Sequence, residues 1–196
     1  MRIAKAQVAQ NREKMLKAAG RLFRERGIGA TGVDAITEGA GLTHGAVYSQ
    51  FGSKEAVAAE AIREALAAGQ RRWQRIAERK GSGKAFPAIV EAYLSPEHRD
   101  AAGKGCVVAA LAGEIARQPE TVRDAFTEEF KRAIDLLADT LPRRSRSRRF
   151  DDAIVAFAAM AGALILARTV RDRKLSNRIL EASAKAVIRL QTPESL

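Results

Sequence analysis

Apolar residues recur with the period of an α-helix along almost the whole chain, and glycine, proline and serine interrupt that period at short intervals. In the segment 11–26 the apolar positions of one helical face are Met15, Leu16, Ala19, Leu22 and Phe23. Gly27 follows this segment, at the position just after a helix where glycine is favoured. No segment shows the alternating pattern of a β-strand over a useful length. The sequence therefore predicts an all-α fold.

The breaks in the helical pattern divide the chain into about nine helices. The predicted helices cover residues 11–26, 34–39, 44–50, 53–80, 86–94, 106–117, 120–141, 151–173 and 176–190. Only 5% of the residues are aromatic and alanine is abundant, which favours helices over a sheet. With 196 residues the chain is long enough to bury a core. We expect two domains, residues 1–54 and residues 55–196, joined by the long helix.

Basic residues outnumber acidic residues by 34 to 23, which gives a formal net charge of +11. The excess is uneven, because residues 1–54 carry a net charge of +5 whereas residues 81–142 carry −3. A surplus of this size indicates a polyanionic partner. Charge alone would suffice for a DNA-binding protein of the nucleoid type, which ignores base sequence, so that class stays open beside a sequence-reading protein.

Three short helices in the first 54 residues have the spacing of a helix-turn-helix motif. A helix over 34–39 and a second one over 44–50 flank a turn that contains Gly41. The second helix is about 10 Å long, so its end fits into a DNA major groove about 12 Å wide. Val47 and Phe51 are expected to point back into the core of this domain. The spacing therefore predicts double-stranded DNA as a partner.

The residues expected to contact DNA lie on this second helix and at the ends of the neighbouring helices. They are Thr31, Gly32, Thr43, His44, Gly45, Tyr48, Ser49 and Lys54. Gly45 lets the backbone approach closely, Tyr48 offers its hydroxyl to a phosphate, and Lys54 adds a positive charge near the DNA backbone. The positive end of the helix favours the same anions.

Some of these roles have alternatives. Thr31 fits the Ser/Thr-x-x-acid pattern of a helix start, so it acts either as a cap alone or as a cap and a phosphate contact. His44 contacts a base or a phosphate, or it is a solvated or capping residue. Arg2, Lys5 and Arg12 form either an arm on the DNA or an untethered basic tail.

Residues 31–55, TGVDAITEGAGLTHGAVYSQFGSKE, resemble the TetR/AcrR family of transcriptional regulators. The resemblance covers about residues 11–60, and it departs mildly at Thr37 and Gly39, where alanine is more usual. A weaker resemblance to one branch of the family lies in 93–99 and 105–114. The resemblance implies an all-α homodimer with an N-terminal DNA-binding domain and a C-terminal domain that dimerises and binds a small effector. The protein is then expected to be a ligand-responsive regulator, a repressor that leaves a palindromic operator when its effector binds.

Apolar residues at helical spacing in the second domain are the candidates for an effector pocket. They are Trp73, Ile76, Phe86, Ile89, Tyr93, Cys106, Leu111, Phe126 and Phe130. The same residues would serve equally well as an ordinary core. A pocket of this composition suits a hydrophobic or amphipathic molecule.

The single cysteine, Cys106, follows Gly103-Lys104-Gly105 at an expected helix start. A helix N-terminus and a nearby lysine favour the reactive thiolate form, which would make Cys106 a sensor of electrophiles or oxidants. A buried Cys106 would instead be an inert small apolar residue. Both interpretations stay open.

The C-terminal third contains a basic run and two candidate dimer helices. Five arginines occur within residues 143–149, and their mutual repulsion predicts an exposed, partly disordered loop. The segment 151–170 is apolar almost all round, so we expect it to be buried on more than one side. We predict that 151–170 and 176–190 pair across a two-fold axis as a four-helix bundle, with burial inside one subunit as the alternative. The small residues that would allow close approach are Ala158, Ala159, Ala161 and Gly162.

Other classes of protein lack support in the sequence. One cysteine and two distant histidines do not suggest a metal site, and no glycine-rich phosphate loop or Ser/His/Asp pattern suggests an enzyme or a cofactor. The apolar run 153–167 is too short to span a bilayer, and residues 1–15 lack the apolar core of a signal peptide. We therefore expect a cytoplasmic protein that has no membrane association and no catalytic activity.

Overall fold

The computed structural model describes residues 5–43, 45–81, 83–142 and 145–189. Within these ranges the regular structure is helical, with no strand, which confirms the predicted all-α fold. The ten α-helices of the described ranges are α1 (Lys5–Arg26), α2 (Val33–Ala40), α3 (Gly45–Phe51), α4 (Lys54–Lys80), α5 (Ala85–Tyr93), α6 (Pro96–Asp100), α7 (Val107–Ile115), α8 (Glu120–Asp139), α9 (Arg146–Thr169) and α10 (Arg173–Arg189). One 3₁₀ turn, η1 (Ala102–Lys104), separates α6 from α7.

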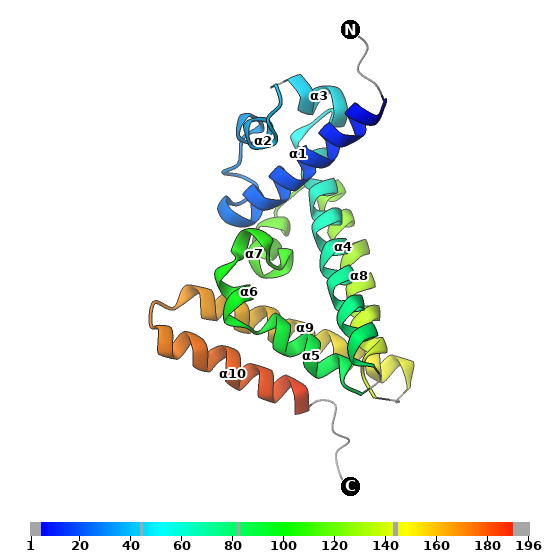
Figure 1. Ribbon diagram of the computed structural model, residues 1–196, viewed down its shortest axis with the longest axis vertical. Helices are drawn as coiled ribbons and strands as arrows, with labels where there is room; N and C mark the ends of the chain where they lie inside the picture. The colour runs from blue at the N-terminus through cyan, green and yellow to red at the C-terminus, as the bar shows by residue number, and fades with distance from the viewer. Residues whose placement is uncertain (1–4, 44, 82, 143–144, 190–196) are drawn as a thin grey trace.

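The helices form a small head above a larger body (Figure 1). We call α1–α3 the head, which lies at one end of the molecule. The long helix α4 leaves the head and runs beside α8 to the opposite end, where α9 pairs with α10 and α5 packs against α4 and α10. α6, η1 and α7 lie between the head and this lower layer, so they are in a position to connect the two.

Local capping explains where the helices of the head begin and end. α2 ends at Gly41, whose φ of +67° suits glycine, and the N–H groups of Gly41 and Leu42 bond back to carbonyls of the last helical turn. α4 begins after Ser53, whose hydroxyl accepts a hydrogen bond from the Ala56 N–H at 3.1 Å. These caps fix α3 between two sharp breaks, as the glycine and serine positions predicted.

One predicted helix boundary is wrong, and one short helix was missed. α1 begins at Lys5 rather than at residue 11, because residues 5–10 form an exposed helical extension that has no apolar face to reveal it. α6 was not predicted, since five residues are too few to show a helical period. Its start is marked by Ser95, which accepts a hydrogen bond from the His98 N–H at 3.2 Å, and by Pro96 in the first turn.

The predicted arginine-rich loop is also wrong over 146–149, which form the first turn of α9. Ser145 caps this turn by accepting a hydrogen bond from the Arg148 N–H at 3.3 Å. Arginine is a good helix former, and a first turn lets such side chains extend into water, so the charges do not prevent the helix. Arg146 and Arg148 are exposed, as expected, whereas residues 143–144 lie outside the described ranges.

Two apolar clusters make up the core. One surrounds α9 in the lower layer and includes Phe86, Leu137, Phe157 and Met160. The other holds the head together around Phe23, but it continues through the first half of α4 into α7 and the start of α8. Head and body therefore share a continuous apolar contact.

α9 is long and apolar enough to cross a membrane by length and composition alone. The apolar run 153–167, which is too short on its own to span a bilayer, is only a part of this helix. One face of α9 is buried in the core, where Ala153, Phe157 and Leu164 are each at most 2% exposed. Other large apolar side chains of α9 are exposed, notably Val155 and Leu166, each 56% exposed. α9 is thus a core helix with a second, uncovered apolar face.

Candidate nucleic-acid interface and internal cavity

α3 presents polar groups on the outside of the head and is anchored by an apolar residue. Val47 is fully buried, which matches its predicted inward orientation, and Phe51 is half-buried. On the opposite side, Tyr48 is 51% exposed, and Gly45 and Ser49 are exposed beside it. No atom lies within 4 Å of the position that a Cβ would occupy on Gly45, so this side of α3 is open for a close approach.

The other predicted DNA contacts near α3 divide into exposed and buried residues. Gly32 and Thr43 are exposed, while His44 lies outside the described residues. Thr31 is 1% exposed, and its hydroxyl donates to the Gly27 carbonyl at 2.7 Å. The N-cap of α2 is Gly32, so the predicted capping role of Thr31 is wrong, and its buried side chain is not available to DNA in this conformation.

Two basic residues near α3 have different environments. Lys54 lies in the first turn of α4, as predicted, and its Nζ lies 3.5 Å from the Gly29 carbonyl oxygen. Arg12 does not belong to a flexible arm, because it is ion-paired with Glu60, donates to the Gln50 carbonyl at 2.8 Å and stacks 4.1 Å over the Phe51 ring. Arg12 therefore holds α1 against α3 and α4. Lys5 begins α1, and Arg2 lies outside the described residues.

Two polar tethers join the head to the body. The Glu114 carboxylate of α7 accepts hydrogen bonds from the N–H groups of Ile28, at 2.9 Å, and Gly29, at 2.5 Å. The Arg24 guanidinium of α1 donates through Nε and Nη2 to the Gly103 carbonyl, at 2.9 and 2.6 Å. Both tethers reach the head where α1 ends, so a shift of α7 or η1 would pull on the head.

A cavity of about 170 Å³ lies between α1, α4, α5, η1 and α7. Four predicted pocket residues line it: Trp73, Ile76, Tyr93 and Cys106. The other five do not line it and pack in the apolar clusters instead: Phe86, Ile89, Leu111, Phe126 and Phe130. The aromatic wall consists of Trp73, Tyr93 and Phe157, with ring centroids 5.6–6.2 Å apart.

Sequence reasoning missed the polar residues that line the cavity. Arg24, Arg72, His98 and Lys104 come from separate segments of the chain and all line the cavity. These residues are polar and far apart in the sequence, so neither apolar periodicity nor any local pattern identifies them as cavity residues. Within the described residues no cluster of three histidine, cysteine or acidic side chains could hold a metal ion.

His98 organises the floor of the cavity beside Cys106. Its Nδ1 lies 2.7 Å from the Tyr93 carbonyl oxygen, and its Nε2 lies 3.0 Å from the Cys106 backbone nitrogen. These contacts require a proton on Nδ1, which donates to Tyr93, and a bare Nε2, which accepts from Cys106. Burial lowers the pKa of His98 and so favours this neutral form. Both ring nitrogens are occupied, so His98 is a positioning residue for the half-buried Cys106.

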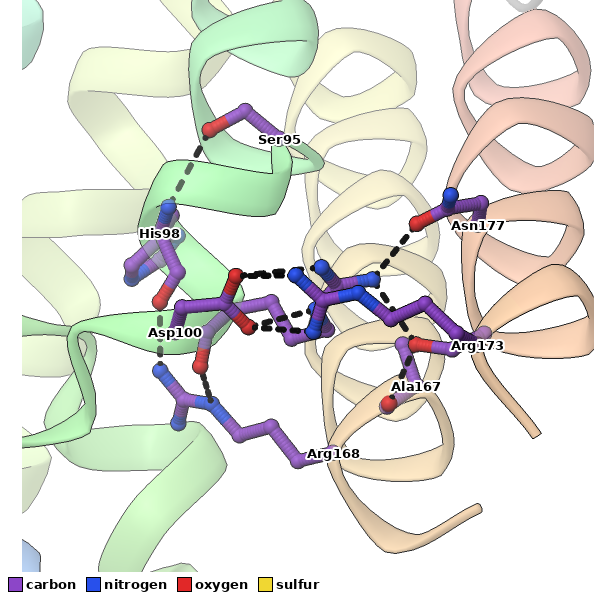
Figure 2. Close-up of polar contacts among 9 residues, drawn as sticks. Ser95, His98, Asp100, Ala167, Arg168, Arg173 and Asn177 are labelled. Atoms are coloured by element: carbon purple, nitrogen blue, oxygen red, sulfur yellow. Dashed lines mark hydrogen bonds and ion pairs between the residues drawn. The ribbon is translucent and has the colours of Figure 1, made fainter. Parts of the chain in front are cut away.

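A polar cluster ties the His98 segment to α9 and α10 (Figure 2). Arg168 of α9 donates to the His98 and Arg99 carbonyls, at 2.8 and 3.1 Å. The Asp100 carboxylate accepts hydrogen bonds from the guanidinium groups of Arg99 and Arg173, which hold the pKa of this carboxyl well below the ordinary value. The buried Arg99 also donates to Ser176 and Asn177 of α10. The cavity floor is therefore fixed to the α9–α10 pair.

The sequence matches two known families along most of its length. Residues 15–61 match the bacterial regulatory proteins of the tetR family, and residues 82–182 match the C-terminal domain of LmrA/YxaF-like transcriptional regulators. An uncharacterized HTH-type transcriptional regulator of Mycobacterium tuberculosis is 30% identical over 176 residues, which cover 82% of this chain and 86% of that protein. The HTH-type transcriptional repressor KstR2 of the same organism is 42% identical over 57 residues, 29% of this chain and 28% of that protein.

Solved structures show the same fold over nearly the whole chain. The crystal structure of reduced Escherichia coli NemR superposes with a TM-score of 0.77 and 21% sequence identity, covering 95% of this chain and all of that one. The helix-turn-helix head, the matches to both halves of the chain and the shared fold agree with the predicted family. The chain belongs to the TetR family of bacterial transcriptional regulators.

Proposed function

We propose that this regulator binds a palindromic operator as a homodimer and represses transcription until a small effector enters the cavity described above. The observation that carries the proposal is the geometry of α3, which is anchored by buried Val47 and exposes Gly45, Tyr48 and Ser49. A helix of this length enters a major groove end-on, and its outward residues then meet base edges and phosphates. Gly32, Thr43 and Lys54 add contacts around it, and His44 belongs to the same proposed set.

The proposed dimer uses the uncovered face of α9 together with α10. Ile154, Val155, Ile165 and Leu166 of α9 and Leu175 of α10 are large apolar residues that are 41–56% exposed. Ala158, Ala159 and Gly162 lie on the accessible side of α9, whereas Ala161 faces the core, contrary to the sequence prediction. An apolar face of this extent is typical of an interface, and a second copy of the same face would bury it in a four-helix bundle.

α4 provides a physical route between the cavity and DNA. Lys54 begins this helix at the head, while Arg72, Trp73 and Ile76 line the cavity near its other end. A helix of 27 residues is about 40 Å long and behaves as a stiff rod. Two heads of a dimer must match half-sites about 34–36 Å apart or a multiple of that distance, so a small tilt of α4 would lower the affinity for the operator.

The proposal assigns DNA binding and effector binding to different domains. Residues 1–54 would form the DNA-binding domain, and residues 55–196 the effector-binding and dimerisation domain. The family consists of transcriptional regulators, so we infer a non-enzymatic protein that acts in the cytoplasm, where its DNA is. The KstR2 match over the head is the basis for proposing repression.

Competition between DNA duplexes tests the proposal. A palindromic fragment from upstream of the protein's own gene is labelled and titrated with the protein in excess unlabelled, unrelated duplex. We expect the complex to persist, because base contacts from α3 add to the phosphate contacts that any duplex offers. Loss of the labelled complex in parallel with that of a scrambled fragment would instead identify a sequence-indifferent nucleoid protein.

A further inference from the structure

The central cavity has a cationic wall. Arg24 of α1, Arg72 of α4 and Lys104 of η1 all line it, and the described lining contains no aspartate or glutamate. Burial lowers the pKa of Arg24, which means that its positive charge is incompletely solvated. Gln70, also in the lining, is already bonded to the buried Glu129, whose carboxylate pairs with Arg132. The residues that line the cavity thus carry positive but no negative charge, and the acidic neighbour of Arg24 is Glu25, outside the lining.

The rest of the cavity lining is mainly apolar and includes a buried hydroxyl. Trp73, Tyr93 and Phe157 form the aromatic wall. Tyr93 is 4% exposed, and its buried hydroxyl has no oxygen or nitrogen partner in the described part of the chain, with the Cys106 thiol as its neighbour. Burial, with a smaller effect of neighbouring Cys106, raises the pKa of this hydroxyl well above its ordinary value, so it stays protonated and able to donate. A buried donor without an oxygen or nitrogen partner is uncommon and suits a ligand acceptor.

We propose that the effector is a small amphipathic anion of the carboxylate class. Its carboxylate binds Arg24 with help from Arg72 and Lys104, and its apolar part lies against Trp73, Tyr93 and Phe157. An apolar cavity with a few convergent polar groups is the usual form of a small-molecule site, and arginine is the side chain best suited to a carboxylate. This assignment adds the chemical class of the effector to the proposed function. Binding of the anion does not depend on the proposed function, whereas its effect on DNA binding does.

Arg24 also connects the proposed ligand site to the head, because it belongs to α1. It holds the Gly103 carbonyl of η1 through Nε and Nη2. A carboxylate bound to this guanidinium competes with the Gly103 carbonyl for its donors. The η1 segment is closely packed at this point, because a Cβ on Gly103 would come within 2.2 Å of Glu25 Oε1. Binding of the anion therefore changes a contact that joins the head to the body.

The binding experiment uses the full-length dimeric protein without DNA and a matched pair of probes, octanoate and octanamide. The chain has one tryptophan, Trp73, which lines the cavity, so its fluorescence reports occupancy directly. We expect octanoate to change the fluorescence saturably and to bind at least about tenfold more tightly than octanamide, since the two differ in charge and not in chain length. Equal affinities, or no saturable change with octanoate, would overturn the proposal.

Three variants locate the anion. Arg24→Gln and the exposed Arg72→Gln should each weaken octanoate binding by about tenfold and leave octanamide binding unchanged. Arg26→Gln, in the same last turn of α1 but outside the lining, makes the same charge change and should bind octanoate like the wild type. Wild-type octanoate affinity in both cavity variants contradicts the assignment, and Arg72→Gln decides the matter if Arg24→Gln does not fold. Operator binding without probe is measured on the same preparation, so a failed ligand site is distinguishable from a failed regulator.

Discussion

Burial divides the residues near α3 that we propose as DNA contacts into two groups. Thr31 has its hydroxyl engaged inside the head, whereas Tyr48 is half-exposed on the outer face of α3. Lys54 lies at the start of α4, and its Nζ is 3.5 Å from the Gly29 carbonyl oxygen, a long distance for a hydrogen bond. Such a weak contact leaves the ammonium able to turn toward a phosphate. Lys54 is therefore expected to supply affinity rather than base preference.

Lys54→Ala should weaken binding to all DNA sequences by a similar factor. The reason is that a phosphate contact releases counterions without reading a base, so the slope of log K against log salt should fall by about one. The measurement is a salt titration with operator and scrambled duplexes. Lys131→Ala, an exposed lysine of α8 in the body, serves as the control and should leave the slope unchanged. A variant that lost affinity only for the operator would show that Lys54 takes part in base recognition.

The environment of Cys106 bears on whether this residue is a thiol sensor or an inert packing residue. It lines the cavity and is only half-buried, so a small reagent can reach it. Its backbone N–H is held by His98, which fixes its place at the start of α7.

Alkylation of Cys106 with iodoacetamide should lower the affinity for the operator, because the added carbamidomethyl group occupies cavity volume. Since the chain has one cysteine, the site of modification is unambiguous by mass. Cys106→Ser, which preserves size and removes the nucleophile, should keep its operator affinity after the same treatment. Equal operator release from both proteins would remove the sensor interpretation and leave Cys106 as a packing residue.

At the scale of helices, the connection between α7 and the head depends on one carboxylate. Glu114 accepts hydrogen bonds from two successive N–H groups, those of Ile28 and Gly29, at the end of α1. Gly27 precedes them with φ +90°, and a Cβ there would come within 2.9 Å of Glu114 Oε2. The turn and the carboxylate are thus fitted to each other, and α7 adjoins the cavity through Val107.

Glu114→Gln should destabilise the protein by about 1–2 kcal/mol. A glutamine side chain has one acceptor oxygen, so one of the two N–H groups would face an NH₂ group and lose its partner. The midpoint of urea unfolding measures the change. Glu91→Gln, on an exposed position of α5, is the matched control and should unfold like the wild type. An unchanged midpoint in Glu114→Gln would mean that the tether contributes nothing to holding the head.

The helices α2 and α3 were predictable from sequence, whereas the start of α1 was not and the cavity was predictable only in part. Gly41 and Ser53 act through local backbone geometry, which a sequence displays directly, so α2, α3 and the start of α4 were placed within one residue. Helix α6 has five residues and no period to detect. Arg24 and Lys104 meet only because α1 packs on η1, a tertiary contact that no local pattern encodes.

At the scale of the whole molecule, the α6–α7 segment contacts three parts of the protein: the head, the cavity and the α9–α10 pair. Arg24 and Glu114 connect this segment to the head, and His98 forms the cavity floor. Arg168 of α9 and the ion pairs of Asp100 with Arg99 and Arg173 connect the same segment to α9 and α10. These two helices also carry the exposed apolar face. An effector in the cavity therefore touches a structure that contacts both the head and the proposed dimer helices.

Leu166→Glu should convert the protein from a dimer to a monomer. Leu166 is 56% exposed on α9, and a two-fold axis brings both copies of a residue into the same interface, so each dimer loses two apolar contacts and gains two carboxylates at an apolar surface. Burial of one leucine contributes about 1.5–3 kcal/mol, and operator affinity should also fall by more than about tenfold because the two heads no longer bind together. Light scattering coupled to size-exclusion chromatography measures the mass. Val8→Glu, an exposed apolar position on α1, controls for the charge and should remain dimeric. If Leu166→Glu stayed dimeric with unchanged operator affinity, α9 would not form the interface, and its exposed apolar face would need another partner.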